Sequence, residues 1–170
     1  VAHPPVPLET MVAYFNFDMV GRLRENKLIV QAVGSSPAWR GMLEKRNIPV
    51  GLTLSPQDDP WLPTDLTSFY AQKVPGLAFF TDLHEDYNRP TDDVETLNYE
   101  GMAKVADLAR RLIDDAVNPA TVIEYARVEQ QAQPSSRMGR RVYTGMVPDF
   151  AGSTDVQGMR VSDVRAGGPA

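Results

Sequence analysis

The sequence predicts an α/β domain followed by a β-rich segment. Three observations predict this arrangement. Four short apolar runs have the length and the β-branched or aromatic content of buried strands, and they lie at residues 10–20, 27–33, 50–55 and 76–80. Segments with helical spacing or helix-start signals lie between and after them. A polar stretch then separates this region from two further strand-like runs.

Turn residues limit each expected strand. Residues 10–20 read as a strand that ends near Asp18, where Gly21 allows the chain to turn. The run at 27–33 is closed by the sequence Gly-Ser-Ser-Pro. The run at 50–55 leads into a loop whose prolines exclude regular structure. The strand at 76–80 leads into an acidic loop.

Capping residues mark the expected helices. Ser36 precedes Pro37, which suits the first position of a helix, and Thr64 or Asp65 can cap a helix over 66–73. Asn98 opens a long helix. Its apolar residues recur at a spacing of three to four, and they are Met102, Val105, Ala106, Ala109, Leu112, Ile113 and Ala116. Asn118 and Pro119 interrupt this pattern, and residues 120–131 are a candidate for its continuation as a helix.

The composition predicts how the chain is organised. We expect a domain over residues 1–132, a linker over 133–140 and the start of a second, β-rich domain over 141–170. The chain begins without Met and stops after a Gly-Gly-Pro turn signal, so we expect it to be a piece of a longer protein.

Bulk properties exclude several classes of function. A net charge of −5 without a basic run argues against a nucleic-acid surface. No apolar stretch approaches the roughly 18 residues of a membrane span. The sequence contains no Cys, which excludes disulfides and thiol chemistry.

Two groups of polar residues follow expected strands, where open α/β sheets bind ligands. The first is Asp18, which either ligates a metal or hydrogen-bonds backbone amides of the turn at Gly21. The second is the stretch "TDLHEDYNRPTDD", residues 81–93, with five acidic residues and one of the two histidines. Here His84 is either a metal ligand or an ordinary loop residue, and Asp92 is most simply a cap of the next segment.

Three motifs occur together in order: "NFDMVGRL", "DDPWLPTDLTSFY" and "GLAFFTDLHEDYNRPTDDVETLNYEGM". Together they resemble the C-terminal half of a zinc aminopeptidase of the M28 metallopeptidase family, in the branch that carries a PDZ domain. The resemblance covers about residues 1–129, and residues 140–170 resemble the first strands of a PDZ domain. The implied fold is a partial zinc-exopeptidase-type sheet flanked by helices, followed by a truncated PDZ-like segment.

The resemblance also implies roles for individual residues. The family uses two zinc ions that share a bridging carboxylate and a water, with a Glu as general base. Asp18 matches a metal ligand of the family, and Tyr87 is the candidate to stabilise the oxyanion. Asp65 would orient neighbouring loops, and Asp92 matches the Asp of the family's Tyr-His-x-x-x-Asp loop. The other ligands and the base would precede Val1, so the chain alone is expected to be inactive.

Asn88 departs from the family pattern, because it stands where the family has a His ligand. An amide is a poor zinc donor beside an imidazole. Three readings follow: His84 takes over as ligand, the site is weakened or binds one metal, or the protein has lost catalysis. His84 lies four residues before Asn88. One helical turn would place the two on the same face.

The function predicted is therefore peptide-bond hydrolysis by metal-activated water in an aminopeptidase, with peptides as substrates. The alternative is a non-catalytic peptidase-like shell whose PDZ domain binds peptides by strand addition. The resemblance further implies a secreted, periplasmic or membrane-anchored exterior location.

Overall fold

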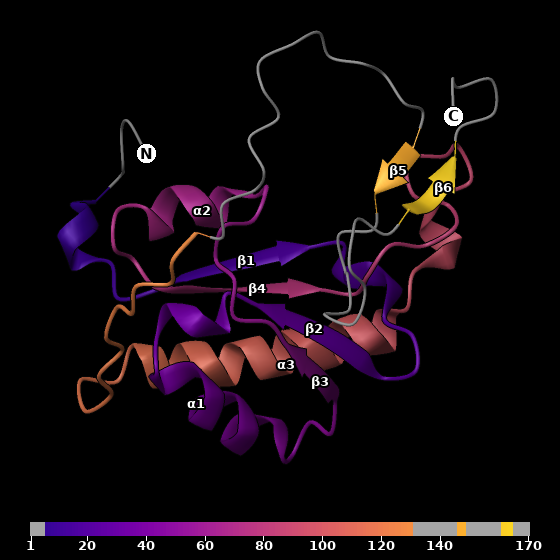
Figure 1. The fold of residues 1–170 in the computed structure, drawn as a ribbon. Coiled ribbons are helices and arrows are strands. Elements are labelled where there is room, and N and C mark those ends of the chain that lie inside the picture. Colours follow the sequence, from indigo (N-terminus) through magenta and orange to yellow (C-terminus); the bar gives the residue numbers. More distant parts are fainter. Residues whose placement is uncertain (1–5, 131–145, 149–160, 165–170) are drawn as a thin grey trace, which may run out of the picture. The chain divides into compact units, whose positions relative to one another are not determined.

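A computed structural model describes residues 6–130, 146–148 and 161–164. The chain divides into two compact units, Val1–Gln130 and Gln131–Ala170. The described part of the first unit contains four strands and three α-helices (Figure 1): β1 (Tyr14–Asp18), β2 (Lys27–Gln31), α1 (Ala38–Asn47), β3 (Thr53–Pro56), α2 (Asp65–Tyr70), β4 (Gly76–Phe80) and α3 (Tyr99–Ala116). Short 3₁₀ turns lie between them, at η1 (Leu8–Thr10), η2 (Val20–Arg22), η3 (Val33–Ser35) and η4 (Val94–Thr96). The α/β fold is as predicted.

The strands form one mixed sheet in the order β1-β4-β2-β3. β1 runs parallel to β4, whereas β2 is antiparallel to β4 and parallel to β3. The register pairs Asp18 with Phe80, so the carboxyl ends of β1 and β4 lie side by side at one edge of the sheet. The turn after β1 and the acidic loop after β4 therefore start from neighbouring points.

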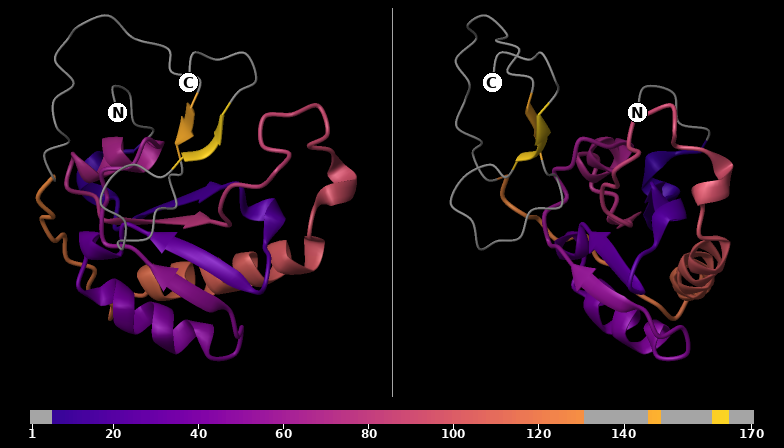
Figure 2. Two further views of the ribbon diagram at one scale, coloured as in Figure 1. Left: turned by 45° about the vertical axis from the view of Figure 1, so that its right-hand side comes forward. Right: turned by 90° about the vertical axis from the view of Figure 1, so that its right-hand side faces the viewer.

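Helices cover both faces of β4, which is buried along its whole length. Leu77 and Phe79 pack into a core cluster with side chains of α1 and α3, whereas Ala78 packs with Leu66 and Tyr70 of α2. Figures 1 and 2 show α1 and α3 on one side of the sheet and α2 on the other. The alternation along β4 is the two-residue period of a strand covered on both faces.

Two of the predicted caps are present. The Ala38 amide donates to the Ser36 hydroxyl at 3.3 Å, and the Gly101 amide donates to the Asn98 side chain at 2.8 Å. Thr64 precedes α2 as predicted, but neither it nor Asp65 makes a capping hydrogen bond; within the described part of the chain the Thr64 hydroxyl is buried without a partner.

The buried stripe of α3 differs slightly from the predicted one. Val105, Ala109, Leu112 and Ala116 are buried, and so is Leu108. Ala106 is exposed and Ile113 is 38% exposed. The centre of the stripe thus lies nearer Leu108, since residues at 105, 108, 109 and 112 follow the three-and-four spacing of one helix face.

The segment 121–130 is not a helix, so the predicted continuation of α3 is wrong. Asn118 and Pro119 end the helix in a turn, and the β-branched run at 121–123 disfavours a restart. The segment instead joins η3 to α2: the Ala126 amide donates to the Ser35 carbonyl at 2.8 Å, and the Tyr70 hydroxyl donates to the Ala126 carbonyl at 2.9 Å. We call residues 121–130 the strap.

The second unit is described only at β5 (Met146–Pro148) and β6 (Val161–Val164), which pair antiparallel as a two-stranded sheet. The predicted linker at 133–140 and the rest of the PDZ-like segment lie outside the described residues. Among the described residues, no helix is both long and apolar enough to cross a membrane.

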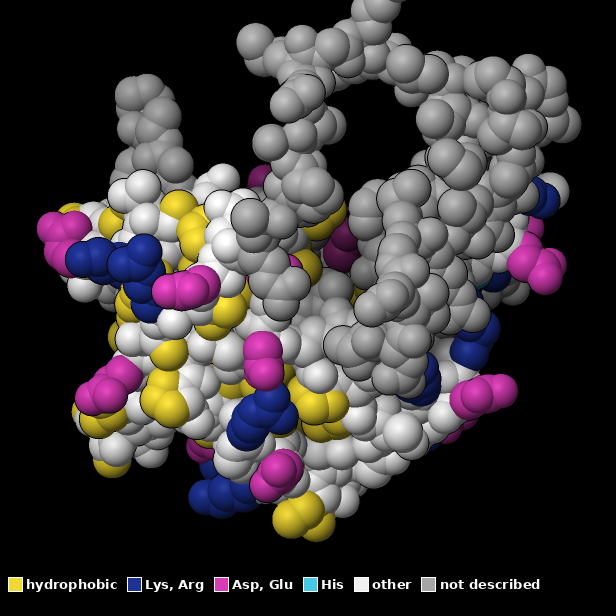
Figure 3. Space-filling model, in the orientation of Figure 1, with side chains coloured by type: hydrophobic (Ala, Val, Ile, Leu, Met, Phe, Trp, Pro, Cys, Tyr) yellow, Lys and Arg dark blue, Asp and Glu magenta, His cyan; other side chains and the backbone are white. Residues whose placement is uncertain are grey.

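On the face shown in Figure 3, Lys and Arg side chains lie among Asp and Glu side chains. Neither sign of charge dominates the described part of this face.

Candidate active site

Asp18 is the last residue of β1, and its side chain is exposed. Met19 takes the left-handed conformation, with φ of 50°, and its carbonyl accepts a hydrogen bond from the Thr81 hydroxyl just after β4. Among the described residues, no side chain or amide pairs with the Asp18 carboxylate. The turn therefore does not use this carboxylate as an internal cap, which leaves it available to a ligand.

Gly21 brings the turn after β1 against the end of the acidic loop. A Cβ atom at this position would lie 2.6 Å from Leu97 Cδ2, and the Gly21 carbonyl accepts from the Asn98 amide at 2.9 Å. Only glycine allows such close packing without a shift of its neighbours.

The acidic loop does not form the helical turn that would place His84 and Asn88 on one face. The Tyr87 amide donates to the His84 carbonyl at 3.0 Å, which closes a turn of the i to i+3 kind. Asn88 then takes the left-handed conformation, with φ of 57°. This conformation ends any helical path, and Pro90 disfavours helix at the preceding residue.

Two arginines hold the loop, and sequence reasoning did not identify either as important. Arg22 Nη2 lies 2.7 Å from Asp92 Oδ1 and 3.2 Å from Asp86 Oδ2. Arg24 donates to the carbonyl oxygens of Thr81 and Leu83, at 3.2 and 2.8 Å. A signal was present, since Arg22 lies within the first motif and a loop with five acidic residues needs cations nearby.

His84 is nearly buried, with 9% of its side chain exposed, and its Nε2 lies 3.7 Å from Asp92 Oδ2. Its Nδ1 is buried and has no hydrogen-bond partner within the described part of the chain. Burial lowers the pKa of the imidazole, and the positive charge of Arg22 lowers it further. His84 is thus held neutral at neutral pH, the form that binds metals.

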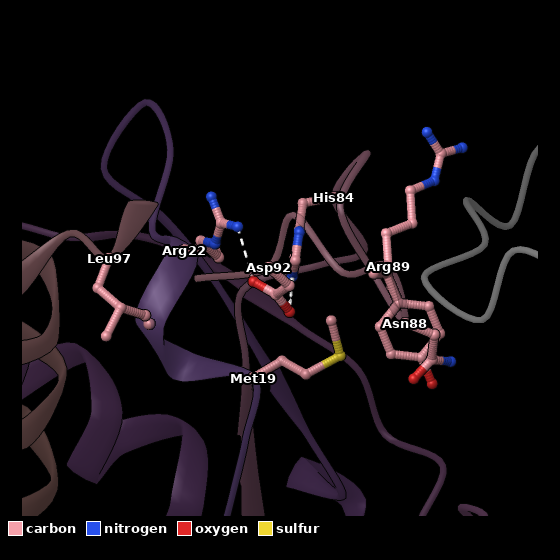
Figure 4. Close-up of a pocket in the computed structure, with 9 residues that line it drawn as sticks. Met19, Arg22, His84, Asn88, Arg89, Asp92 and Leu97 are labelled. Atoms are coloured by element: carbon pink, nitrogen blue, oxygen red, sulfur yellow. Dashed lines mark hydrogen bonds and ion pairs between the residues drawn. The ribbon is translucent and has the colours of Figure 1, made fainter. Parts of the chain in front are cut away.

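A cavity of about 410 Å³ gathers several of the predicted residues. It is lined by Met19, Gly21, Arg22, His84, Tyr87, Asn88, Arg89, Asp92 and Leu97. In Figure 4 the His84 ring lies beside Asp92 with Arg22 beyond it, and the amide of Asn88 points away from that ring. The Tyr87 and His84 rings meet edge to face, with centroids 6.4 Å apart.

Asp18 and Asp65 are not among the residues that line this cavity. Asp65 lies at the start of α2, where burial and the Asp65 charge together raise the pKa of Tyr14. Tyr14 is the first residue of β1 and Asp18 the last, so Asp65 is placed toward the opposite end of that strand from Asp18.

The model of peptidase family M28 matches residues 1–113. The chain belongs to peptidase family M28. No match was found among curated proteins. The predicted PDZ-bearing branch is a finer assignment, which the family match does not address.

Solved aminopeptidase structures share the fold of this M28 chain. It is 21% identical to BSAP, a zinc aminopeptidase from Bacillus subtilis, with a TM-score of 0.55 over 72% of this chain and 32% of that one. The aminopeptidase from Aneurinibacillus sp. strain AM-1 gives 20% identity and a TM-score of 0.55, over 72% and 29% of the two chains. LapA aminopeptidase of Legionella pneumophila gives 13% identity and a TM-score of 0.53, over 69% of this chain and 32% of that one. The chain thus spans about a third of their length.

The described residues of this M28 chain do not by themselves complete a zinc site. They contain no group of three or more His, Cys, Asp or Glu side chains arranged to hold a metal ion. Zinc sites in proteins use three or four protein donors. Asp18 offers a carboxylate and His84 a neutral imidazole, so the chain fits zinc only as part of a larger set of donors.

Proposed function

We propose that this chain forms the C-terminal part of the catalytic domain of a zinc-dependent aminopeptidase that acts on peptides. The observation that carries the proposal is the Asp18 carboxylate, exposed and without a partner among the described residues, at the paired carboxyl ends of β1 and β4. Membership of family M28 supports peptide hydrolysis, and the likeness to BSAP, itself a zinc aminopeptidase, supports the choice of metal.

Each residue has a distinct part in this proposal. Asp18 and the neutral imidazole of His84 would hold zinc together with donors from outside the described residues. When bound, zinc supplies a water of lowered pKa and polarises the scissile carbonyl. Tyr87, 40% exposed at the cavity, would donate its phenolic hydrogen to the oxyanion of the tetrahedral intermediate. Asp92 would orient the His84 ring.

The test uses the intact protein that contains this chain. It should hydrolyse aminoacyl-p-nitroanilides, lose activity with a chelator and regain it with zinc. Tyr87→Phe should lower kcat by about a hundredfold, because one oxyanion donor is lost. Tyr99→Phe is the matched control, since Tyr99 is 60% exposed at the start of α3, and it should leave kcat unchanged. Full activity in chelator would contradict zinc dependence.

Asn88 favours a second candidate, a peptidase-like shell that binds peptides without catalysis. It stands at the position of a family ligand, and its amide points away from His84 (Figure 4). A peptide would then be bound by a PDZ-like second unit through strand addition.

Zinc titration of variants of the intact protein separates these readings. If His84 has taken over as ligand, His84→Ala loses zinc and turnover, while Asn88→Ala has little effect. If the site is only weakened, Asn88→His raises zinc affinity and turnover; His tolerates the left-handed backbone of Asn88, so the substitution adds little strain. If the protein is a non-catalytic peptidase-like shell, neither substitution affects zinc binding or turnover. We expect the first result.

A further inference from the structure

Arg22 joins three points of the loop that follows β4. Its Nη2 donates to Asp92 Oδ1 at 2.7 Å and to Asp86 Oδ2 at 3.2 Å. Its Nη1 donates to the carbonyl oxygen of Thr96 at 3.2 Å. These partners lie 64 to 74 residues further along the chain. One guanidinium thus ties the turn after β1 to the loop from 86 to 96.

The Arg22 charge is more deeply buried than its partners. Its side chain is 13% exposed, against 31% for Asp86 and 37% for Asp92. A cation in such a place is costly unless anions compensate it. Its Nε is buried without a hydrogen bond to any described residue, so its two Nη atoms make its contacts. This contact therefore differs from a solvent-exposed ion pair, which contributes little to stability.

Asp92 links Arg22 to the surroundings of His84, at a distance too long for a hydrogen bond to the imidazole. One carboxylate oxygen of Asp92 accepts from Arg22, and the other lies 3.7 Å from His84 Nε2 (Figure 4). Because a carboxylate is planar, fixing one oxygen fixes the direction of the other. Asp86 accepts in addition from the Thr91 hydroxyl at 2.7 Å, so the turn of the loop is anchored to the same guanidinium.

We propose that Arg22 is a positioning residue, which holds Asp92, and through it the His84 imidazole, beside the end of β1 that bears Asp18. This rests on the proposed function, since the reaction it would serve is the aminopeptidase reaction. A lysine could not replace Arg22, because one ammonium lacks the planar fork that reaches separate acceptors at once.

The experiment compares Arg22→Gln and Arg22→Lys with Arg46→Gln in the intact protein. Arg46 is a control because it too makes charge-assisted hydrogen bonds to an acidic side chain. Both of its bonds go to the carboxylate of Asp115 on α3, away from the cavity. Two quantities are measured: amide hydrogen exchange over residues 86–97, and kcat and KM for an aminoacyl-p-nitroanilide.

Arg22→Gln should speed exchange over 86–97 by about tenfold or more, because charge-assisted hydrogen bonds to the loop are lost. Its kcat should fall by about tenfold or more, with a smaller change in KM. Arg22→Lys should recover only part of either effect. Arg46→Gln should lower the melting temperature while leaving the exchange of this loop and kcat unchanged.

Equal loop exchange in Arg22→Gln and Arg46→Gln, or full recovery by Arg22→Lys, would overturn the proposal. If the unsubstituted protein hydrolyses no peptide, the proposed function fails, and the exchange measurement alone decides the role of Arg22. If Arg22→Gln does not fold, Asp86→Asn replaces it, because this change keeps the pair of Arg22 with Asp92. Faster exchange over 86–91 in Asp86→Asn supports the proposal, and unchanged exchange contradicts it.

Discussion

The two ends of β4 are held by different kinds of interaction. At the amino end, the Ser35 hydroxyl donates to the Gly76 carbonyl at 2.8 Å and accepts from the Gly76 amide and Trp39 Nε1, both at 3.0 Å. This buried hydroxyl thereby uses its one hydrogen and both lone pairs. Gly76 must be glycine, because a Cβ atom there would lie 2.6 Å from the Tyr14 carbonyl oxygen.

The strap adds aromatic packing on this side of the molecule. The Tyr70 hydroxyl donates to the Ala126 carbonyl at 2.9 Å and accepts from the Val128 amide at 2.6 Å. Trp61 Nε1 donates to the Val128 carbonyl at 3.1 Å, and the Tyr70 and Tyr125 ring centroids lie 5.1 Å apart. These hydrogen bonds are partly buried, and together they help to fix one arrangement of the strap.

At the carboxyl end, charged side chains and an exposed loop take the place of buried neutral groups. Arg22 and Arg24 hold this loop, and Asp18 lies beside it without a partner among the described residues. These contacts order the loop, and loops on a rigid scaffold commonly carry function. One end of the strand therefore stabilises the fold, and the other presents the candidate site.

The largest effect should come from the core near the amino end. Trp39 is fully buried and meets Phe15 edge to face, with ring centroids 5.8 Å apart. Trp39→Ala should lower the free energy of unfolding by about 3–5 kcal/mol, measured by urea denaturation. Ile48→Ala is the control, since Ile48 is 80% exposed, and it should change that free energy by less than about 0.5 kcal/mol.

Ser35→Ala should have the next largest effect. The change leaves the Gly76 amide and Trp39 Nε1 buried without the hydroxyl that accepts from both. We expect a loss of about 2–3 kcal/mol in the free energy of unfolding. A loss as small as that of Ile48→Ala would contradict the role given to this hydroxyl.

Tyr70→Phe should cost about 1–2 kcal/mol at neutral pH, because two hydrogen bonds to the strap are lost. Burial, followed by the neighbouring Tyr125, raises the pKa of Tyr70 from 10.0 to about 12. A raised pKa stabilises the fold below pH 10, and this contribution is lost as pH rises from 10 toward 12. The stability of the unsubstituted protein should therefore fall over that range more than that of Tyr70→Phe, in urea titrations at each pH.

The smallest effect should come from a charged pair away from the cavity. A hydrogen bond from Arg46 holds the pKa of Asp115 below its ordinary value, against the effect of burial. A pKa that is lowered in the folded state stabilises the fold at pH values above the pKa of the unfolded state. This contribution is lost as pH falls through the pKa of the folded state. Asp115→Asn should thus cost about 1 kcal/mol or less near neutral pH and less still in acid. If the loss of stability in Asp115→Asn instead grew as the pH was lowered, the predicted direction of the pH dependence would be contradicted.

Local patterns predicted most of the fold. The strand of 76–80 and the caps at Ser36 and Asn98 follow from short-range chemistry, and the structure confirms them. The path of 121–130 could not be predicted in this way, because contacts with Ser35 and Tyr70, distant in sequence, decide it.

The same limit applies to the site. Sequence patterns put Asp18 and the acidic loop at strand ends, and the parallel pairing of β1 with β4 brings those ends together. They did not predict Arg22, whose importance depends on three partners more than sixty residues away. The left-handed Asn88 was also missed, because it follows from the turn that begins at His84.

The most direct test of the proposed metal site is the zinc content of the intact protein with Asp18→Asn, beside Asp114→Asn. Asp114 is an exposed carboxylate on α3 that pairs with Arg110, so its replacement makes the same chemical change away from the site. We expect Asp18→Asn to lower bound zinc and abolish peptide hydrolysis, while Asp114→Asn retains both. Unchanged zinc and turnover in Asp18→Asn would contradict the assignment of this carboxylate as a ligand.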